Sequence, residues 1–252
     1  MASVNILDRE AFEQAKLKVL LKQNDPHGFG TLQEKTVHAV MKLYYEPDFH
    51  EVPVEGYIAD IYAEGHIIEI QNGNFNRLRS KLAVFLPLYQ VTVVLPIPHY
   101  KWVIWMEEET GELSKKHKSP VTGNVYHAFP ELYKIKQYLG HPNPSFAFPL
   151  LDMDEYRLLN GWSKNRKRGS SRYDRMPLNL FDEVKVDRTE DFLQLVPYEL
   201  EEPFTVRDFA QAVGIHRDLS GSVLPLLAYM QLLTRVGKRG REYLYTVDEK
   251  YR

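Results

Sequence analysis

Several things are missing from this sequence, and each absence removes a class of protein. The 252 residues include no cysteine, which excludes disulfides, thiolate metal sites and cysteine nucleophiles. No stretch approaches eighteen consecutive apolar residues, the length that a membrane-spanning helix needs. The N-terminal segment has no small-residue cleavage site of the kind that ends an export signal. We therefore expect a cytoplasmic protein with no membrane partner.

The formal net charge is small, at -2, but the cations are unevenly distributed. Residues 160–175 contain six Lys or Arg and one Asp, a local net charge of +5. The six are Lys164, Arg166, Lys167, Arg168, Arg172 and Arg175. Glycine, serine and two aromatic residues accompany them, which is typical of a loop that follows nucleic-acid phosphates. A solvated loop without function is the alternative.

The pattern of apolar residues predicts an α/β domain followed by a smaller unit. Helical spacing marks residues 8–22, 31–45 and 76–86, and apolar runs at 57–63, 66–70, 89–97 and 100–107 predict strands. A surface excursion is expected over 107–128, a short helix that starts with proline over 130–139, and an extended segment after it. Helices alternating with strands favour a mixed sheet flanked by helices. We place the domains at 1–187 and 188–252.

Two carboxylates interrupt the apolar hairpin of residues 56–75. The dipeptide Glu64-Gly65 separates its strands, and a two-residue turn with Gly second fixes the register so that paired numbers sum to 129. Asp60 then faces Glu69. Side-chain alternation places Gln71 with both carboxylates, and places Ala59, Ile61, Ile68 and Ile70 together on a core face.

Facing carboxylates are costly, so something must compensate for them. Two unit charges about 5 Å apart repel by roughly 3 kcal/mol at an effective dielectric constant near 20. A divalent cation would offset this repulsion, because Mg²⁺ is held by one or two carboxylates together with water and substrate phosphate. A solvated face, or pairing with a nearby cation such as Arg77, remains the alternative.

The combination of Asp60, Glu69-Ile-Gln71, a preceding helix with Glu34 and a following basic helix resembles the PD-(D/E)XK nuclease superfamily. The resemblance covers about residues 31–106 and implies the restriction-endonuclease-like fold. It implies that Asp60 and Glu69 bind Mg²⁺ (or Mn²⁺), that Gln71 takes the third motif position, and that Glu34 completes the site.

This sequence departs from the superfamily pattern at two positions. Gln71 stands where the family usually has lysine, and a neutral amide orients water but supplies no positive charge. Lys81 or Arg77, on the following helix, can supply that charge from another direction. Residues Ile58-Ala59 precede Asp60 where the family has proline.

Other candidate groups have simpler interpretations. Glu34 is the third residue after Thr31, so the pair also fits a helix capping box. The histidines His27, His38, His50, His66 and His99 have no spacing suited to a metal site, and we interpret them as surface or core groups.

Residues 203–247 resemble a winged helix-turn-helix domain. A helix ending at Gly214, a short turn and a second helix precede a hairpin with the tip Gly237–Gly240. The first turn of the second helix would meet the major groove, and the cationic hairpin would contact phosphates. The DNA-contacting residues expected here are His216, Arg217, Ser220, Ser222, Lys238, Arg239 and Arg241. Pro225 requires the second helix to start near Ser222, because proline is tolerated only in the first turn. Winged helices also serve as protein-binding modules.

Three functions compete. The first is a Mg²⁺-dependent DNA endonuclease of the restriction or repair type, for which a homodimer would suit double-strand cutting. The second is a catalytically inactive nuclease-like protein that binds DNA, such as a regulator. The third is a protein-interaction scaffold. Salt-dependent DNA binding separates the third from the others, and cation-dependent cleavage separates the first from the second.

Overall fold

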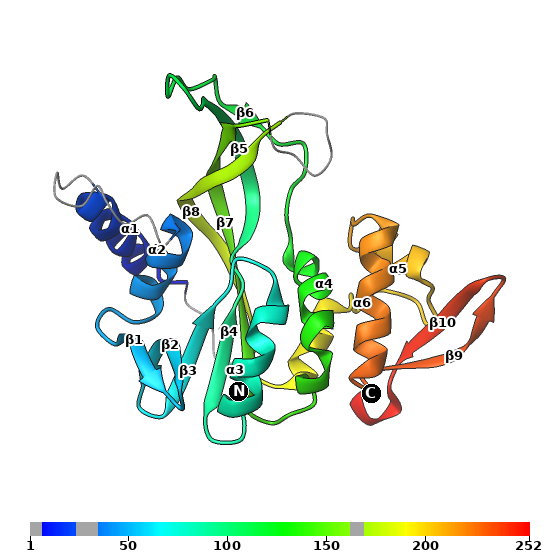
Figure 1. Cartoon of the computed structure of the whole chain (residues 1–252). Helices are drawn as coiled ribbons and strands as arrows, with labels where there is room; N and C mark the ends of the chain where they lie inside the picture. The colour runs from blue at the N-terminus through cyan, green and yellow to red at the C-terminus, as the bar shows by residue number, and fades with distance from the viewer. Residues whose placement is uncertain (1–6, 24–34, 162–168) are drawn as a thin grey trace.

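The computed structural model describes residues 7–23, 35–161 and 169–252. Its described part is an α/β arrangement, in which a mixed eight-stranded sheet is flanked by helices and followed by a small helical unit with a two-stranded sheet of its own (Figure 1). The α/β class and the mixed sheet with helices against it are therefore as predicted.

The helices agree with the predicted order but not with every predicted boundary. The α-helices are α1 Arg9–Gln23, α2 Thr36–Tyr45, α3 Arg79–Phe85, α4 Phe129–Leu132, α5 Val206–Ala212 and α6 Arg217–Tyr229. The 3-10 helices are η1 Phe75–Leu78, η2 Val125–Ala128, η3 Tyr133–Tyr138, η4 Thr189–Leu195 and η5 Glu249–Tyr251. Within the described residues α2 begins at Thr36, with Lys35 as its N-cap. The expected start of this helix and the capping pair Thr31 and Glu34 lie outside the described residues.

The large sheet combines an antiparallel edge with a parallel centre. Its strands are β1 His50–Val54, β2 Tyr57–Ala63, β3 His66–Ile70, β4 Gln90–Val94, β5 Ile97–Glu107, β6 His117–Lys118, β7 Pro144–Leu159 and β8 Ser171–Val186. The order is β1-β2-β3-β4-β7-β5-β6, and β8 pairs with β7. Strands β3, β4 and β7 run parallel, whereas β1-β2-β3 and β7-β8 are antiparallel. The sequence patterns missed β1, β6 and β8.

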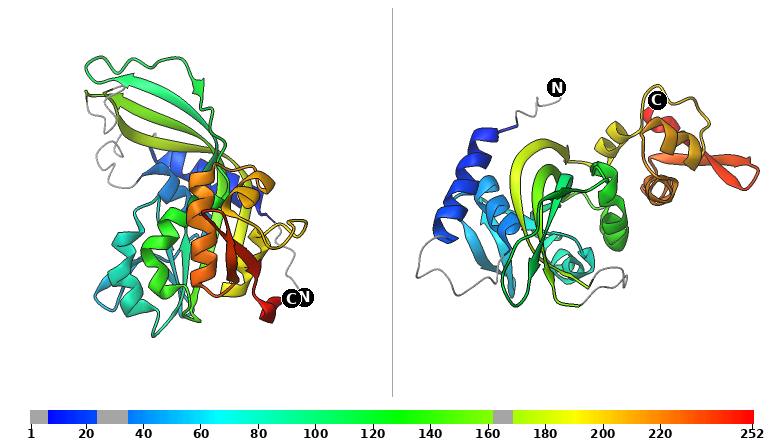
Figure 2. Two further views of the ribbon diagram at one scale, coloured as in Figure 1. Left: turned by 90° about the vertical axis from the view of Figure 1, so that its right-hand side faces the viewer. Right: turned by 90° about the horizontal axis from the view of Figure 1, so that it is seen from above.

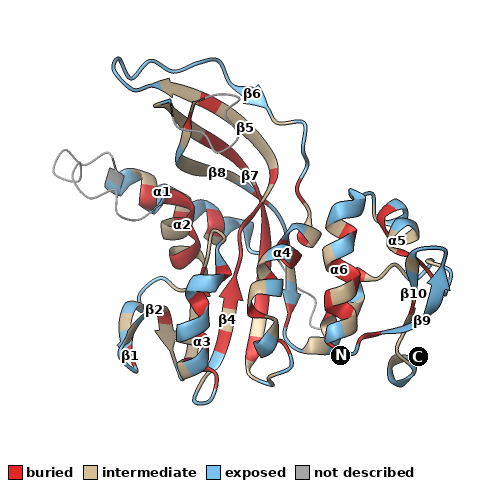
Figure 3. Ribbon diagram, turned by 45° about the vertical axis from the view of Figure 1, so that its right-hand side comes forward, coloured by how far each residue is buried: buried red, intermediate tan, exposed pale blue. Residues whose placement is uncertain are grey.

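Two groups of buried side chains cover the two faces of this sheet. On one face, α1 and α2 pack against Ile61, Ile70 and Leu151. On the other, α3 and α4 pack against Ile67, Val93 and Phe148. Figure 2 shows these helices on opposite sides of the strands, and Figure 3 shows the burial concentrated along the central strands.

Strands β5, β7 and β8 continue beyond the helices and, with the short strand β6, form a projecting arm, which we define as residues 100–118, 152–159 and 171–179 (Figure 1). Strand β4 pairs with the first part of β7, and β5 pairs with the second part. Between them, β4 and β5 cover one edge of β7. The antiparallel strand β8 covers the other edge of β7. Arg172 and Arg175, expected in a loop, lie in β8.

The C-terminal unit consists of α5, α6 and the hairpin of β9 Leu233–Arg239 and β10 Glu242–Val247. It packs on the main sheet domain through Tyr126, whose ring centroid lies 5.7 Å from that of Phe209. The turn of the hairpin is Gly240-Arg241, because Arg239 pairs with Glu242.

The second helix of this unit differs from the prediction. It begins at Arg217, not near Ser222, so Pro225 lies in its interior. Proline has no N–H to donate to the carbonyl oxygen four residues earlier, which here belongs to Gly221. That residue is exposed, so water can satisfy the carbonyl oxygen.

No helix within the described ranges is both long and apolar enough to cross a membrane.

Candidate active site

The β2-β3 hairpin has the predicted register. Ala63 pairs with His66, Tyr62 with Ile67 and Ile61 with Ile68. Both turn residues have positive φ, 53° at Glu64 and 81° at Gly65, as a two-residue hairpin turn requires. The sequence rule for this turn therefore fixed the strand alignment correctly.

The ladder between β2 and β3 ends one step before the two carboxylates. The pairing stops at Ile61 and Ile68, and the N–H of Ile70 donates a 2.8 Å hydrogen bond to Oδ2 of Asp60. The predicted core face is also interrupted, since Ala59 packs with the α3 side of the sheet, whereas Ile61, Ile68 and Ile70 pack with the α1 and α2 side. The strict alternation of side chains is thus lost at Asp60, whose carboxylate, in place of a backbone carbonyl group, accepts the hydrogen bond from the N–H of Ile70.

Asp60 is held from α2 as well as from β3. Nε2 of His38 lies 3.2 Å from Oδ2 of Asp60, and both side chains are mostly buried. Burial alone would raise the pKa of Asp60, but His38, the Ile70 N–H and the Lys81 ammonium outweigh it and lower this pKa. Asp60 is therefore a fixed, ionised oxygen donor at neutral pH.

Glu69 lies on the same hairpin and is completely buried. The ammonium of Lys81, on α3, lies 2.9 Å from Oε1 and 2.7 Å from Oε2 of Glu69, and 2.7 Å from the carbonyl oxygen of Ile58. Burial and repulsion from Asp60 nevertheless raise the pKa of Glu69 to about 7. Asp60 therefore lies close enough to Glu69 to oppose the ionisation of Glu69.

This donor set suits a hard divalent cation. Carboxylate and amide oxygens are typical ligands of Mg²⁺, and Oδ1 of Asn72, just beyond the strand, is buried without a hydrogen-bond partner. Within the described ranges, however, no group of three or more His, Asp or Glu residues is placed to hold a metal. Glu34, the candidate third carboxylate, lies outside those ranges.

Gln71 lies on the wall of an open cavity of about 1110 Å³, which His38 and Ile70, the hydrogen-bond partners of Asp60, also line; Asp60 and Glu69 are not among the lining residues. The cavity, which we call the cleft, is lined by Lys35, His38, Glu51, Ile70, Gln71, Asn72, Gly73, Asn74, Arg77, Glu131 and Arg172. These residues come from α2, β1, the end of β3, η1, α4 and β8. The cleft therefore lies where the arm leaves the helices.

The charges that line the cleft favour an anionic ligand. The two acidic residues that line the cleft, Glu51 and Glu131, already have cationic partners. Glu51 lies 2.6 Å from Lys42, and Glu131 lies 2.5 Å from Lys134. Arg77 and Arg172 are exposed residues that form no ion pair with any residue that the structure describes, although burial and the neighbouring Arg175 lower the pKa of Arg172. They are free to bind phosphate.

The other cations of the predicted basic loop divide into two groups. Arg175 lies 3.0 Å from the buried carboxylate of Glu155, which Lys101 and Arg157 also approach. Arg175 thus contributes to the folding of the arm. Lys164, Arg166, Lys167 and Arg168 lie outside the described residues.

The expected DNA-contacting residues of the C-terminal unit are not equally accessible. Ser220 is fully buried and its hydroxyl donates to the carbonyl oxygen of Val206, so it is withdrawn from any surface. Arg217 lies 2.8 Å from Glu242, and Arg239 lies 3.0 Å from Asp208. Lys238 lies over the ring of Tyr243. The hairpin turn leaves Arg241 exposed.

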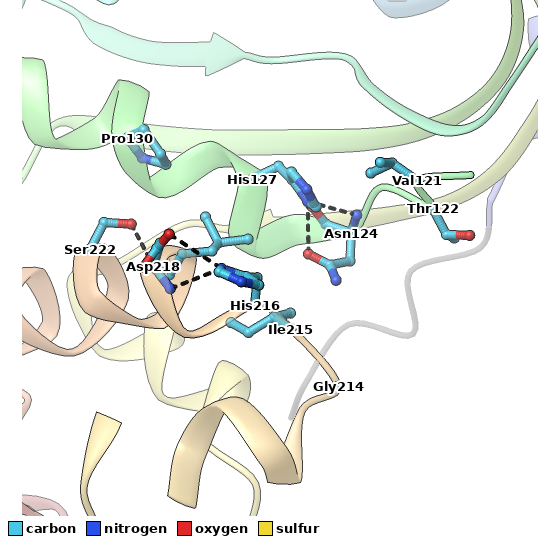
Figure 4. Close-up of a pocket in the computed structure, with 11 residues that line it drawn as sticks. Val121, Thr122, Asn124, His127, Pro130, Gly214, Ile215, His216, Asp218 and Ser222 are labelled. Atoms are coloured by element: carbon cyan, nitrogen blue, oxygen red, sulfur yellow. Dashed lines mark hydrogen bonds and ion pairs between the residues drawn. The ribbon is translucent and has the colours of Figure 1, made fainter. Parts of the chain in front are cut away.

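The start of α6 borders a second hollow, of about 500 Å³, between this unit and the chain before α4 (Figure 4). His216 caps α6 there and lies 3.4 Å from Asp218. Ser222 also lines this hollow, but its hydroxyl donates to the carbonyl oxygen of Leu219.

Sequence reasoning missed two residues of the candidate site. His38 is separated from Asp60 by 22 positions, and nothing in the spacing of the histidines marks it. Asn72 follows Gln71 directly, so a search for amide oxygens beside the Glu-Ile-Gln motif could have found it.

Comparisons with known proteins identify a family. Residues 35–187 match a family described as a domain of unknown function, DUF8091. The match covers more than half of the chain, which therefore belongs to this family. The chain is also similar to an uncharacterized protein of Treponema pallidum (strain Nichols), with 27% identity over 225 residues, which cover 85% of this chain and 86% of that protein. No solved structure matches the chain.

Proposed function

We propose that this member of the DUF8091 family is a Mg²⁺-dependent endonuclease that hydrolyses phosphodiester bonds in DNA, with a restriction-endonuclease-like core. The observation that best supports this function is the coupling of Asp60 and Glu69, with Lys81 bonded to both oxygens of Glu69. His38, the partner of Asp60, lines a cleft whose two arginines form no ion pair with the described residues. Two coupled carboxylates next to an anion-binding surface are what cation-assisted phosphodiester hydrolysis requires.

Each residue of the site has a chemical role in this proposal. Asp60 and Glu69 would hold Mg²⁺, which when bound supplies positive charge to neutralise the scissile phosphate. Gln71 orients the attacking water, because its amide can both accept and donate hydrogen bonds. Lys81 provides the charge that the superfamily usually places at the position of Gln71.

Other residues position the catalytic groups and the substrate. His38 fixes the orientation of the Asp60 carboxylate. Arg77 and Arg172 bind phosphates on either side of the scissile bond. In the C-terminal unit, a winged-helix role is proposed for His216 and Arg217 at the start of α6 and for Lys238, Arg239 and Arg241 in the hairpin. Ser222 remains a weaker candidate there because its hydroxyl is already bonded.

A DNA-binding protein without catalysis is the second candidate. It is favoured by the engagement of both Glu69 oxygens by Lys81. It is also favoured by the lack of a third His, Asp or Glu ligand within the described ranges.

Cleavage assays separate these two functions. Wild-type protein, Asp60→Asn and Glu69→Gln are incubated with supercoiled, linear, branched and single-stranded DNA in Mg²⁺, in Mn²⁺ and in EDTA. The exposed carboxylate of the same hairpin turn provides the matched control, Glu64→Gln. The endonuclease requires cleavage by wild type and by the control that depends on the divalent cation and that both site variants lose. If no substrate is cut but DNA still binds in EDTA, the second candidate is correct.

A further inference from the structure

The arm has two chemically different faces. Residues paired across neighbouring strands share a face, and alternate residues point to opposite faces. Arg157 pairs with Arg172, so the face of Glu155 and Arg157 is continuous with the cleft. Asp154, one residue before Glu155 on β7, points to the opposite face, and it pairs with Trp102. Trp102 therefore lies on the face that is turned away from the cleft.

Aromatic rings and lysines gather on this opposite face. The ammonium of Lys118 lies 3.8 Å from the ring centroid of Tyr100 and 5.8 Å from that of Trp102. The ammonium of Lys116 lies 4.7 Å from the ring of Trp102 and 2.6 Å from Oδ1 of Asp154. We call Tyr100, Trp102, Lys116 and Lys118 the aromatic-lysine patch. Asp154 cancels one of its two positive charges, so a net charge of +1 remains.

Of the two lysines that cover these rings, Lys118 is easily displaced, whereas Lys116 is also held by the buried carboxylate of Asp154. Both are exposed, and they come from a surface excursion whose own strand, β6, has only two residues. An exposed ammonium over a ring is held more weakly than a nucleic-acid base stacked on the same ring. A nucleotide strand can therefore bring a base to each ring while its phosphates attract the displaced ammonium groups.

We propose that the aromatic-lysine patch binds single-stranded nucleic acid, with bases stacked on Tyr100 and Trp102 and phosphates at Lys116 and Lys118. The alternation of rings and cations matches the alternation of bases and phosphates along an unpaired strand. A duplex exposes no base faces along its length, so it gains little from these rings. If the proposed nuclease function also holds, the patch and the cleft receive different strands, and substrates with an unpaired branch are preferred.

Binding of a short fluorescent oligothymidylate by the full-length protein in EDTA tests this proposal without any cleavage. Fluorescence anisotropy measures affinity for wild type, Trp102→Leu, Tyr100→Leu and Lys118→Ala. Each leucine variant should bind at least tenfold more weakly. Lys118→Ala should bind more weakly and also show a shallower dependence of affinity on salt.

Two matched controls and a conservative variant complete the experiment. Tyr198→Ala removes a ring that is 99% exposed, and Lys115→Ala removes an exposed lysine from the same excursion. Both should bind like wild type, and Trp102→Phe should retain most of the affinity because a ring remains. Circular dichroism checks that each variant is folded.

Two results would overturn the proposal: wild type fails to bind the oligothymidylate, or the folded Trp102→Leu and Tyr100→Leu variants bind it as wild type does. Because no cation is present, neither result depends on whether the protein cleaves DNA. Absence of cleavage in Mg²⁺ would in turn leave the binding result unaffected.

Discussion

The ammonium of Lys81 bridges the two carboxylate oxygens of Glu69, at 2.9 and 2.7 Å. Lys81 belongs to the helix after the hairpin, and it supplies the positive charge that Gln71 cannot. In the absence of metal the same ammonium partly neutralises the repulsion between Asp60 and Glu69. Lys81 therefore both supports the proposed chemistry and competes with a cation for Glu69.

Replacing Lys81 with methionine should separate these two effects. Cleavage at saturating Mg²⁺ should slow by roughly 10²- to 10³-fold, because charge that stabilises the transition state is lost. Mg²⁺ should bind more tightly, because the Glu69 oxygens no longer have a competing partner. Single-turnover cleavage and cation titration measure the two quantities. Lys81→Arg, which keeps the charge, is the control, and unchanged cleavage in Lys81→Met would show that Lys81 has only a structural role.

A lysine at position 71 should restore part of the lost activity. The double variant Gln71→Lys/Lys81→Met places an ammonium at the motif position that usually carries it, next to the same cleft. Its cleavage rate should exceed that of Lys81→Met by about tenfold or more. The comparison uses the same single-turnover assay, with Asn74→Lys/Lys81→Met as the control for a lysine elsewhere on the cleft wall. Equal rates in all three variants would argue against a catalytic position for residue 71.

Arg77→Ala and Arg172→Ala should each weaken DNA binding in EDTA and lower the salt dependence of the affinity by about one unit per lost phosphate contact. Thermal stability should change little, because neither side chain forms an ion pair with the described residues. Arg79→Ala removes an exposed cation two residues after Arg77, at the start of α3, and serves as the control. If all three variants lose affinity equally, the cleft cations have no special role.

The arm should lose stability in acid through Glu155. Its carboxylate is 2% exposed, and although burial alone would raise its pKa, the guanidinium of Arg175, the ammonium of Lys101 and the hydrogen bond from Arg157 lower it to about 2. A depressed pKa means that the stabilisation is complete above the ordinary pKa near 4.5 and is lost as pH falls from there toward 2. Glu155→Gln should therefore be destabilised by roughly 2–3 kcal/mol at pH 7.

Urea denaturation of wild type and Glu155→Gln between pH 7 and pH 3 checks this sign. The difference in unfolding free energy should shrink as the pH falls below 4.5. The exposed Glu107→Gln, at the end of β5, is the control. A difference that stays constant across this range would mean that Glu155 is not held ionised by its neighbours.

Local rules predicted the hairpin of the site correctly. The Glu64-Gly65 turn and the period-two pattern act within fifteen residues, so they set the register regardless of the rest of the fold. The same rules placed Ala59 on the wrong face of the sheet. The Asp60 side chain accepts a hydrogen bond from the N–H of Ile70, and the alternation of side chains is broken there.

Non-local packing explains what the sequence did not reveal. Strand β8 is highly charged at its start, and its strand conformation depends on pairing along almost the whole of β7. The rule that excludes proline from a helix interior misplaced the start of α6. Pro225 offers no N–H to the carbonyl oxygen of Gly221, but Gly221 is exposed, so water can satisfy that oxygen. The contact of His38 with Asp60 joins two elements whose approach only the tertiary fold determines.

The claim that Asp60 and Glu69 together hold one divalent cation can be tested directly by anomalous diffraction from crystals soaked in Mn²⁺. We predict one peak within about 2.0–2.6 Å of a carboxylate oxygen of each residue, with the Lys81 ammonium displaced from at least one Glu69 oxygen. The peak should be absent in Glu69→Gln. An intact Lys81–Glu69 contact with no peak beside Asp60, at a Mn²⁺ concentration that supports cleavage, would contradict the account.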